Sequence, residues 1–472
     1  MAVAEMIMER VIPSTRVSVR PTKKKVVIIG AGPAGLFCAD RLAGHANVTI
    51  YEAGLPIQKR VCPDTGCKTC KICHVLEGEG GAGGFSDGKN TYSLTRGTQM
   101  EKGIFQDKED KWLRYIDEAM VKFAGEGIWF DPLPKPPKEF EGSALKFESY
   151  PLRHVGSDGI RGFIKGFADD LRSRDVDIIL NQSAYPTQYS SDRRINLATK
   201  VVRGVVSDDG FDESDVTVIA TGLQGIPQVE SLMNAMGSPL SSGPAGFGLR
   251  LETDAEILAP IFKRFYDFKL VLEQSSNLTM RSFCCNQNGS VLNERHTDLD
   301  IVSVNGHSFL DLSMRTKSSN MAIIAKLSDV SPTPQDFVRS LGRRIYSEAG
   351  GSAYQPMPEF MQYGNAFNMS YMTNRRARYL SIADLLPGFL LSAFRRFIWE
   401  LNLIVPVISP TSIIYGPEIK YYGKRVNVDR NWRCKDVENL YVIGSGSGYL
   451  DSFVAAALSG IVAAENIRKE VL

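Results

Sequence analysis

The stretch KVVIIGAGPAG, residues 25–35, decides the fold of this chain. Its first five residues form the apolar run that is typical of a buried strand, and its three glycines have the spacing of a turn between that strand and a helix. Gly30 permits the tight turn, Gly32 lets the backbone approach a pyrophosphate, and Gly35 lets the helix pack closely on the sheet. The helix N-terminus then directs free N–H groups at the phosphates.

A second strand, VTIY at 48–51, ends at Glu52. A helical pattern fills the space between the two strands, so residues 25–52 form a β-α-β unit of the size that a parallel sheet requires. A carboxylate at the end of the second strand can accept hydrogen bonds from both hydroxyls of a ribose. This combination predicts binding of an adenosine dinucleotide.

The carboxyl-terminal segment favours FAD over NAD. The sequence LYVIGSGSG at 440–448 is a strand that ends in a glycine turn, and a helix of small residues starts near Ser452. A second helix N-terminus late in the chain suits the flavin end of an extended FAD, where its dipole stabilises negative charge on the reduced ring. The turn Ala220-Thr221-Gly222, which follows another predicted strand, is a third approach of the backbone to the same ligand.

From about residue 25 to its end, the chain resembles the flavoproteins that have two dinucleotide-binding domains. More narrowly, it is similar to a bacterial and archaeal group of FAD-dependent, or NAD(FAD)-utilizing, dehydrogenases. The segments that carry the resemblance are VVIIGAGPAGLFCADRL, GGAGGFSDGK, RHVGSDGIRGFI, VIATG, GFGLRLE, FCC, NQNG, NGHSF and NLYVIGSGSG. The resemblance implies FAD binding and redox chemistry on a small molecule, and it specifies no substrate.

The expected fold is α/β: a Rossmann-like FAD-binding domain of the GR2-like glutathione-reductase type, with an inserted, more antiparallel α+β substrate domain. The expected parts are an N-terminal arm (1–24), the first part of the FAD-binding domain (25–225, with a Gly/Cys-rich loop at 54–100), a substrate or cap domain (226–405) and the C-terminal part of the FAD-binding domain (406–472).

One departure from the family pattern concerns the flavin end. Ser445 stands where such proteins usually carry an aspartate, and Asp451-Ser452 replaces an Arg-Gly pair before the helix. Serine brings no charge, which allows weaker binding, a changed redox potential or lost activity. The predicted cofactor contacts are Gly30, Gly32, Pro33, Ala34, Gly35, Glu52, Ala53, Gly83, Gly84, Ser86, Thr221, Gly222, Gly444, Ser445, Gly446 and Gly448.

The candidate catalytic residues are Lys89, His154 and His307. Lys89 ends a glycine-rich loop and is a candidate for placing positive charge near the flavin ring. The two histidines lie in the motif-like segments RHVGSD and NGHSF, and either is a candidate proton acceptor for hydride removal. Arg250 and Arg315 are candidates for binding a substrate carboxylate.

Four cysteines, Cys62, Cys67, Cys70 and Cys73, lie close together in the sequence. Their spacing leaves three alternatives open: a zinc or iron–sulfur site, a structural or redox-active disulfide, or free thiols. Eight cysteines in 472 residues are too few for a disulfide scaffold, and no secretory signal is evident, so we expect a cytoplasmic protein.

The charge and hydropathy of the chain indicate which kinds of partner are not expected. A net charge of +2 favours neither nucleic acid nor an acidic membrane. The most apolar late stretch, residues 385–408, contains Arg395, Arg396 and Glu400, so we expect an amphipathic helix over a pocket and no transmembrane segment.

The sequence therefore predicts an FAD-dependent oxidoreductase that acts on a small molecule in the dehydrogenase, oxidase or reductase direction. A flavin-dependent monooxygenase and an FAD-holding binding or scaffold protein are the alternatives. The glycines at 243–248 follow no predicted strand, so a dedicated nicotinamide domain is not expected. NAD(P)H as a transient reductant and a redox partner protein remain open as electron donors.

Overall fold

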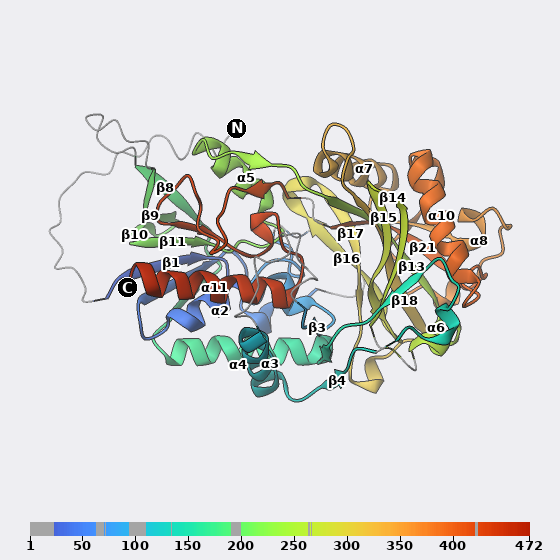
Figure 1. Ribbon diagram of the computed structural model, residues 1–472, viewed down its shortest axis with the longest axis horizontal. Coiled ribbons are helices and arrows are strands. Elements are labelled where there is room, and N and C mark those ends of the chain that lie inside the picture. The colour runs from blue at the N-terminus through green and yellow to red at the C-terminus, as the bar shows by residue number, and fades with distance from the viewer. Residues whose placement is uncertain are drawn as a thin grey trace.

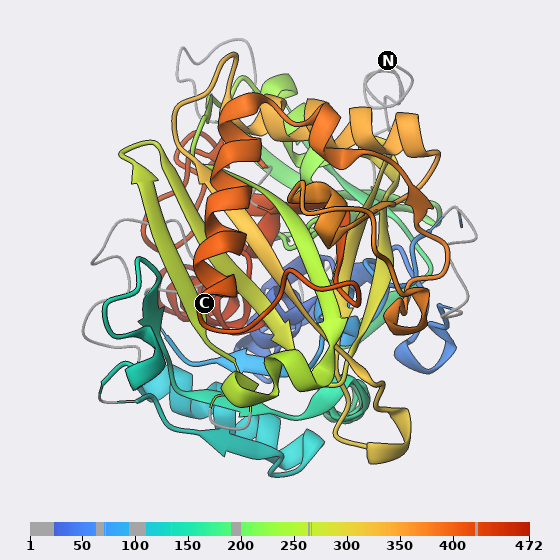
Figure 2. The same ribbon diagram turned by 90° about the vertical axis from the view of Figure 1, so that its right-hand side faces the viewer.

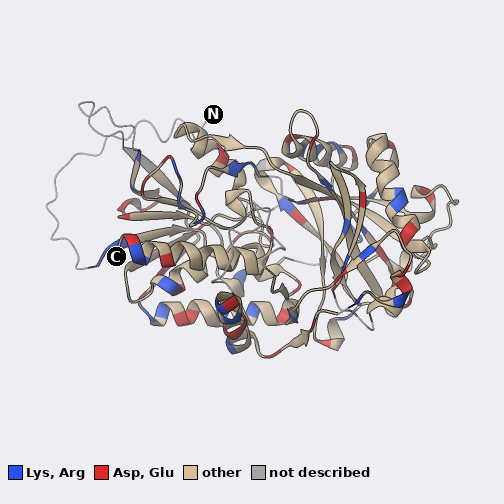
Figure 3. Ribbon diagram, viewed as in Figure 1, with Lys and Arg blue, Asp and Glu red and all other residues tan. Residues whose placement is uncertain are grey.

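The computed structural model describes residues 23–62, 70, 72–93, 110–133, 135–189, 200–262, 265, 267–420 and 423–472. Two β-sheets of different kinds lie side by side, one on each half of the molecule in Figure 1. Lys and Arg are interspersed with Asp and Glu over both halves, and neither sign gathers on one side in the view of Figure 3.

A five-stranded parallel sheet forms the first half, in the order β23-β11-β1-β2-β7. Its buried apolar strands are typical of parallel sheets, which are covered on both faces. The expected mixture of α and β elements, with a β-α-β unit at the glycine loop, is confirmed. The strands are β1 (Lys25–Ile29), β2 (Asn47–Glu52), β7 (Asp177–Leu180), β11 (Val216–Ile219) and β23 (Leu440–Val442).

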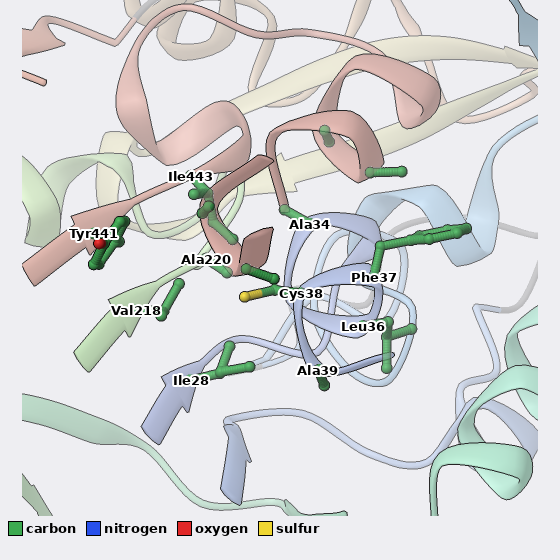
Figure 4. Packing of buried hydrophobic residues seen from close by; sticks show 14 of the residues in the cluster. Ile28, Ala34, Leu36, Phe37, Cys38, Ala39, Val218, Ala220, Tyr441 and Ile443 are labelled. Atoms are coloured by element: carbon green, nitrogen blue, oxygen red, sulfur yellow. The ribbon is translucent and has the colours of Figure 1, made fainter. Parts of the chain in front are cut away.

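Helices cover one face of this sheet, and a small antiparallel sheet covers the other (Figure 1). Figure 4 shows Cys38 of helix α2 (Pro33–Leu42) lying toward Val218 of strand β11 and Ala220, which follows that strand directly. The helices are α2, α3 (Asp110–Ala124), α4 (Gly156–Ser173) and α11 (Phe453–Glu470). The order of the small sheet is β10-β9-β8, formed by β8 (Ala184–Tyr189), β9 (Val201–Ser207) and β10 (Gly210–Glu213).

An eight-stranded sheet forms the second half and is antiparallel except for one edge pair. Two of its strands, β5 (Lys146–Glu148) and β21 (Ile413–Lys420), lie outside the range 226–405, so the predicted boundaries do not coincide with the edges of this sheet. The other strands are β13 (Ala245–Asp254), β14 (Lys269–Ser275), β15 (Leu278–Asn286), β18 (Ser318–Leu327), β19 (Ala353–Pro356) and β20 (Arg378–Tyr379). A hairpin of β16 (Ser290–His296) and β17 (Ile301–His307) lies beside it.

The apolar stretch at 385–408 forms helix α10 (Gly388–Asn402), which crosses one face of the eight-stranded sheet (Figure 2). Its buried side chains, including Phe394 and Phe397, belong to the core of this half. This helix does not cover the large cavity described below, because none of its residues lines that cavity. No helix in the described part of the chain is long and apolar enough to cross a membrane.

The remaining helices are α5 (Ile226–Ala235), α6 (Ala255–Phe262), α7 (Pro334–Ala349), α8 (Met357–Phe360) and α9 (Ile382–Leu385), and the remaining strands are β3 (Lys89–Thr91), β4 (Ile128–Phe130), β6 (Leu152–His154), β12 (Leu240–Ser241) and β22 (Arg425–Val426).

Candidate functional site

A cavity of about 1510 Å³ starts at the carboxyl ends of the parallel strands and extends to the eight-stranded sheet. In open α/β sheets, ligands bind outside the carboxyl ends of the strands. The cavity is lined at one end by Glu52 and Gln182, in its middle by Gly32 and Gly444, and at its far end by Lys420. It therefore connects the predicted dinucleotide site with the second sheet.

The glycine loop has the geometry that each of its glycines requires. Gly30 has a φ of +109°, and a Cβ there would lie 2.4 Å from the carbonyl oxygen of Ala220. A Cβ on Gly35 would lie 2.0 Å from the carbonyl oxygen of Gly30, so helix and strand approach too closely for a side chain. Gly32 differs, because it lines the cavity and its nearest neighbour would be the Cα of Gly81 at 3.9 Å.

Helix α2 begins at this open glycine, and no side chain caps its first turn. Uncapped N–H groups at a helix N-terminus form an anion-binding site together with the helix dipole. The loop thus offers a bare backbone cradle that fits a pyrophosphate.

Glu52 lines the cavity, but its carboxylate already accepts three backbone hydrogen bonds. Oε2 accepts from the N–H of Ala31, and Oε1 accepts from the N–H groups of Gly54 and Gly78, each at 2.9 Å. A carboxylate has about four acceptor positions, so one is left for a ribose hydroxyl. Glu52 therefore also fixes the glycine loop and the following turn.

The flavin end predicted from the sequence lies at the start of helix α11. Ser452 caps this helix by accepting a hydrogen bond from the N–H of Ala455 at 3.1 Å. Ser445 of the preceding glycine turn and Asp451 directly before the cap line the cavity, and Phe453 and Val454 line it in the first turn. The positive end of an 18-residue helix therefore lies at the cavity wall.

Twelve of the predicted cofactor contacts line this one cavity: Gly30, Gly32, Pro33, Ala34, Glu52, Ala53, Gly83, Ser86, Thr221, Gly222, Gly444 and Ser445. Four others, Gly35, Gly84, Gly446 and Gly448, do not line it. A Cβ on Gly448 would lie 2.3 Å from the carbonyl oxygen of Lys424, and one on Gly84 would lie 3.0 Å from Nη1 of Arg60. These glycines allow chain segments to pack closely.

Lys89 lines the cavity, as a charged side chain that is already paired. Its ammonium lies 2.7 Å from Oδ2 of Asp87 and 3.7 Å from Oδ1 of Asp267, and it also donates to the carbonyl oxygen of Cys285. Burial alone lowers the pKa of Lys89, but Asp87 and the other nearby groups raise it well above its ordinary value. Lys89 is therefore a permanent cation in an ion-pair network, which does not suit proton transfer.

His154 and His307 are both buried and do not line the cavity. Burial lowers the pKa of each to about 4, so both are neutral at pH 7. Nδ1 of His307 lies 3.3 Å from Oγ of Ser157. The predicted role of proton acceptor does not follow from this placement, because neither ring lines the cavity.

The prediction that Arg250 binds a substrate carboxylate is wrong. Its guanidinium and the carboxylate of Glu418 are both fully buried and form two hydrogen bonds of 2.8 Å. Arg315, the other candidate, does not line the cavity.

The cysteine prediction is tested only in part, because Cys67 lies outside the described residues. Cys70 and Cys73 carry free thiols, and Cys70 is exposed. Among the residues that the structure describes, no group of three or more His, Cys, Asp or Glu side chains is arranged to hold a metal ion. The glycines at 243–248 run into strand β13 of the antiparallel sheet, which is no dinucleotide-binding turn.

Sequence reasoning missed the charged far end of the cavity. The lining of this end consists of Lys269, Arg281, Phe283, Cys284, Glu294 and Lys420. Cys284 has a φ of +47°, which is strained for a residue other than glycine, and its Sγ donates to Oδ2 of Asp87 at 3.2 Å. The signals for this region in the sequence were the FCC segment of the resemblance and the segment GPEIKYYG at 416–423, which contains Lys420 and precedes the last predicted strand of the FAD-binding domain.

No model of a known protein family matches the chain. A curated relative, described as an uncharacterized protein of Clostridium beijerinckii, is 23% identical over 491 aligned positions, which cover 97% of this chain and 83% of that protein.

Among solved structures, similarity extends over most of the chain at low identity. Glycine oxidase from Bacillus cereus is 11% identical, with 95% of this chain and 96% of that chain covered and a TM-score of 0.40. CtdE in complex with FAD and a substrate is 12% identical, with 95% and 81% covered and a TM-score of 0.40. FqzB is 10% identical, with 95% and 77% covered and a TM-score of 0.43. Scores below 0.5 do not establish a shared fold, so the function must be argued from the residues of this chain.

Proposed function

We propose that this protein binds FAD in the cavity and is an oxidoreductase that transfers a hydride between a small organic substrate and N5 of the flavin. The observation that carries this proposal is that three turns from distant parts of the sequence line one cavity. These turns are the loop at Gly30–Ala34, the turn at Thr221–Gly222 and the turn at Gly444–Ser445. A structural role for each turn alone does not explain why all three meet around an open space.

The shape and donors of the cavity fit an extended dinucleotide. Glu52 and Gln182 would lie at the adenosine end, the bare backbone at Gly32 would hold the pyrophosphate, and the start of helix α11 would lie at the ring. The volume exceeds the roughly 300–1,000 Å³ of ordinary small-molecule pockets, which leaves room for a substrate beside the cofactor. When bound, the flavin supplies two-electron redox chemistry.

Two groups of the protein would stabilise negative charge at the end of the cavity where the flavin ring is proposed to lie. The first turn of helix α11 contributes N–H groups and the positive end of a helix dipole, which stabilise negative charge at the cavity wall. Lys89 contributes a fixed positive charge that Asp87 holds in place. A bound cofactor would displace water from the cavity, which would strengthen both effects.

The test is purification of the protein, measurement of its absorbance spectrum and chromatography of the released cofactor. We expect a yellow protein that releases FAD. If the protein is purified without cofactor, we expect the apoprotein to bind added FAD in preference to FMN and NAD. A colourless protein that binds no added FAD would contradict the proposal.

The direction of the reaction is tested by anaerobic stopped-flow reduction of the yellow protein with NADH, NADPH, amines, amino acids and hydroxy acids. Bleaching of the flavin by any of the organic substrates supports the oxidoreductase. Absence of bleaching with every compound would favour the FAD-holding binding protein, which the uncharged Ser445 also allows.

A further inference from the structure

Three cations surround one aromatic ring at the far end of the cavity. The charged groups of Lys269, Arg281 and Lys420 lie 5.2, 5.4 and 5.4 Å from the centroid of the Phe283 ring. All four side chains line the cavity. Each cation is attracted to the ring face, but the three like charges also repel one another, so the cluster requires negative charge nearby.

Lys269 has its counter-ion in the protein. Its ammonium lies 2.8 Å from Oδ2 of Asp267, and the same carboxylate also lies 3.7 Å from Lys89. This part of the far end is therefore neutralised before any ligand binds.

Unlike Lys269, Lys420 has no carboxylate oxygen at hydrogen-bond distance among the described residues. Its nearest carboxylate oxygen is Oε1 of Glu418 at 3.8 Å, and that oxygen already accepts a hydrogen bond from Arg250 at 2.8 Å. The Lys420 side chain is only 8% exposed, and among the described residues no acceptor lies within hydrogen-bond distance of its ammonium, although the carboxylates of Asp451 and Glu294 also act on its charge. An ammonium has three donors, so a buried one without acceptors points to a missing partner in the cavity.

Within the described part of the chain, Asp451 supplies a buried acceptor without a donor, where Lys420 supplies a buried donor without an acceptor. It lines the same cavity one residue before the cap of helix α11, and its Oδ2 is buried and accepts no hydrogen bond within the described part of the chain. Burial raises its pKa, while Lys420 and Arg281 act in the opposite direction. The charges of Asp451 and Lys420 therefore influence each other, although no ion pair joins them within 4.0 Å.

We propose that Lys420 and Asp451 bind the two polar ends of one substrate, a small carboxylic acid that also carries an N–H or O–H group. Lys420 takes the carboxylate, and Asp451 accepts the hydrogen bond of the N–H or O–H group. The inference rests on the proposed function, because FAD would fill the remainder of the cavity. Asp451 adjoins the predicted ring end and Lys420 belongs to the second sheet, so a molecule held by both would lie between the ring and that sheet.

The edge of a flavin ring also presents hydrogen-bond acceptors and an N–H donor, so the same pair of residues is chemically suited to the cofactor itself. The experiment must therefore measure FAD content and acid binding separately. The variants are Lys420→Met and Asp451→Asn, with Lys420→Arg as the variant that keeps the charge. Lys317→Met and Asp329→Asn are matched controls, since both residues are exposed and neither lines the cavity.

Each FAD-loaded protein is titrated anaerobically with 2-hydroxy acids, 2-amino acids, their uncharged amides and simple carboxylic acids without a second polar group. Binding is read from perturbation of the flavin spectrum and from calorimetry, neither of which requires turnover. We expect the wild type to bind at least one acid with a donor group more tightly than its amide. We expect Lys420→Met to weaken that binding about tenfold or more, with Lys420→Arg restoring part of it, while FAD content stays unchanged. Asp451→Asn should reduce the preference for acids that carry a donor.

Three results would overturn the inference: equal binding of acids and amides, no binding of any acid by the yellow wild type, or loss of FAD in Lys420→Met and Asp451→Asn, which would assign the pair to the flavin edge. A variant that is unfolded by circular dichroism is replaced by the charge-retaining one, whose binding then decides. Failure of the proposed function is seen separately, because a wild type without FAD is recognised from its spectrum before any acid is added.

Discussion

Arg250 on β13 and Glu418 on β21 form a fully buried pair, joined by hydrogen bonds of 2.8 Å from Nε and Nη2 to the two carboxylate oxygens. Nη1 of Arg250 also donates to Oδ1 of Asn320 at 2.8 Å and to the carbonyl oxygen of Cys284 at 3.1 Å. The pair lies two residues from Lys420 and in contact with the residue that carries the strained backbone. It therefore connects four strands, β13, β15, β18 and β21, behind the charged end of the cavity.

Removing one partner of this pair should be costly. Arg250→Met leaves a buried carboxylate without its cation, which should lower the free energy of unfolding by about 3–5 kcal/mol. The measurement is denaturant unfolding of the variant against the wild type. The matched control is Lys165→Met, which breaks an exposed pair with Asp169 and should cost no more than about 1 kcal/mol. Equal losses in the two variants would show that the buried pair does not stabilise the fold.

Substitutions at two glycines of the glycine loop should distinguish effects on folding from effects on FAD binding. Gly35→Ala places a Cβ 2.0 Å from a backbone oxygen, so we expect poor folding and a marked fall in the melting temperature. Gly32→Ala meets no atom closer than 3.9 Å, so the fold should be retained while FAD affinity falls, because the methyl group occupies the cradle of the pyrophosphate.

Gly351→Ala is the control for this series, since its Cβ would meet nothing within 4 Å and its φ is not positive. The measurements are melting temperature and FAD titration of each apoprotein. Unchanged FAD affinity in Gly32→Ala would remove the pyrophosphate from this loop.

Buried histidines should make the fold sensitive to acid. Burial lowers the pKa of His154 and His307 to about 4 and that of His296 to about 3, whereas an unfolded histidine titrates near pH 6.5. The folded state therefore binds fewer protons, so this contribution to stability is present above about pH 6.5 and is lost as the pH falls toward 4.

The check is the slope of unfolding free energy against pH between pH 7 and 5, in the wild type and in His307→Gln. The variant should lose less stability over this range, whatever its stability at pH 7. Buried Glu252 acts in the opposite direction, because burial raises its pKa to about 7, so the difference between the two proteins is the quantity to compare. Identical slopes would show that His307 titrates normally.

Cysteine reactivity should follow exposure and pKa. We expect iodoacetamide to modify exposed Cys70 first and buried Cys73 more slowly, because the thiolate is the reacting species and must be reached by the reagent. Cys284 should react slowly, since burial raises its pKa to about 12. Timed labelling of the native protein, followed by peptide mass spectrometry, measures these rates. If Cys70 reacts only after a chelator or a reductant is added, Cys70 belongs to a metal site or a disulfide and is not a free thiol.

The backbone turns of the predicted cofactor site could be predicted from short stretches of sequence. Gly30, Gly32 and Gly35 follow an apolar strand at fixed spacing, and the late turn at Gly444 precedes a helix in the same way. Such turns depend on local steric limits, since a positive φ or a close backbone approach excludes side chains whatever the rest of the chain does. The β-α-β unit and the antiparallel character of the second sheet could be predicted for the same reason: strand and helix periods are local patterns.

The sequence by itself therefore determined that the chain has a parallel sheet with a glycine cradle, and it favoured FAD as the ligand. Only the tertiary structure decided which charges meet at the far end of the cavity. The tertiary structure pairs Arg250 with Glu418 and places Lys420 and Asp451 on the lining of one cavity. It leaves His154 and His307 outside that lining. These relationships depend on strand pairing between residues that are far apart in the sequence, and burial and counter-ions are set only when those strands assemble.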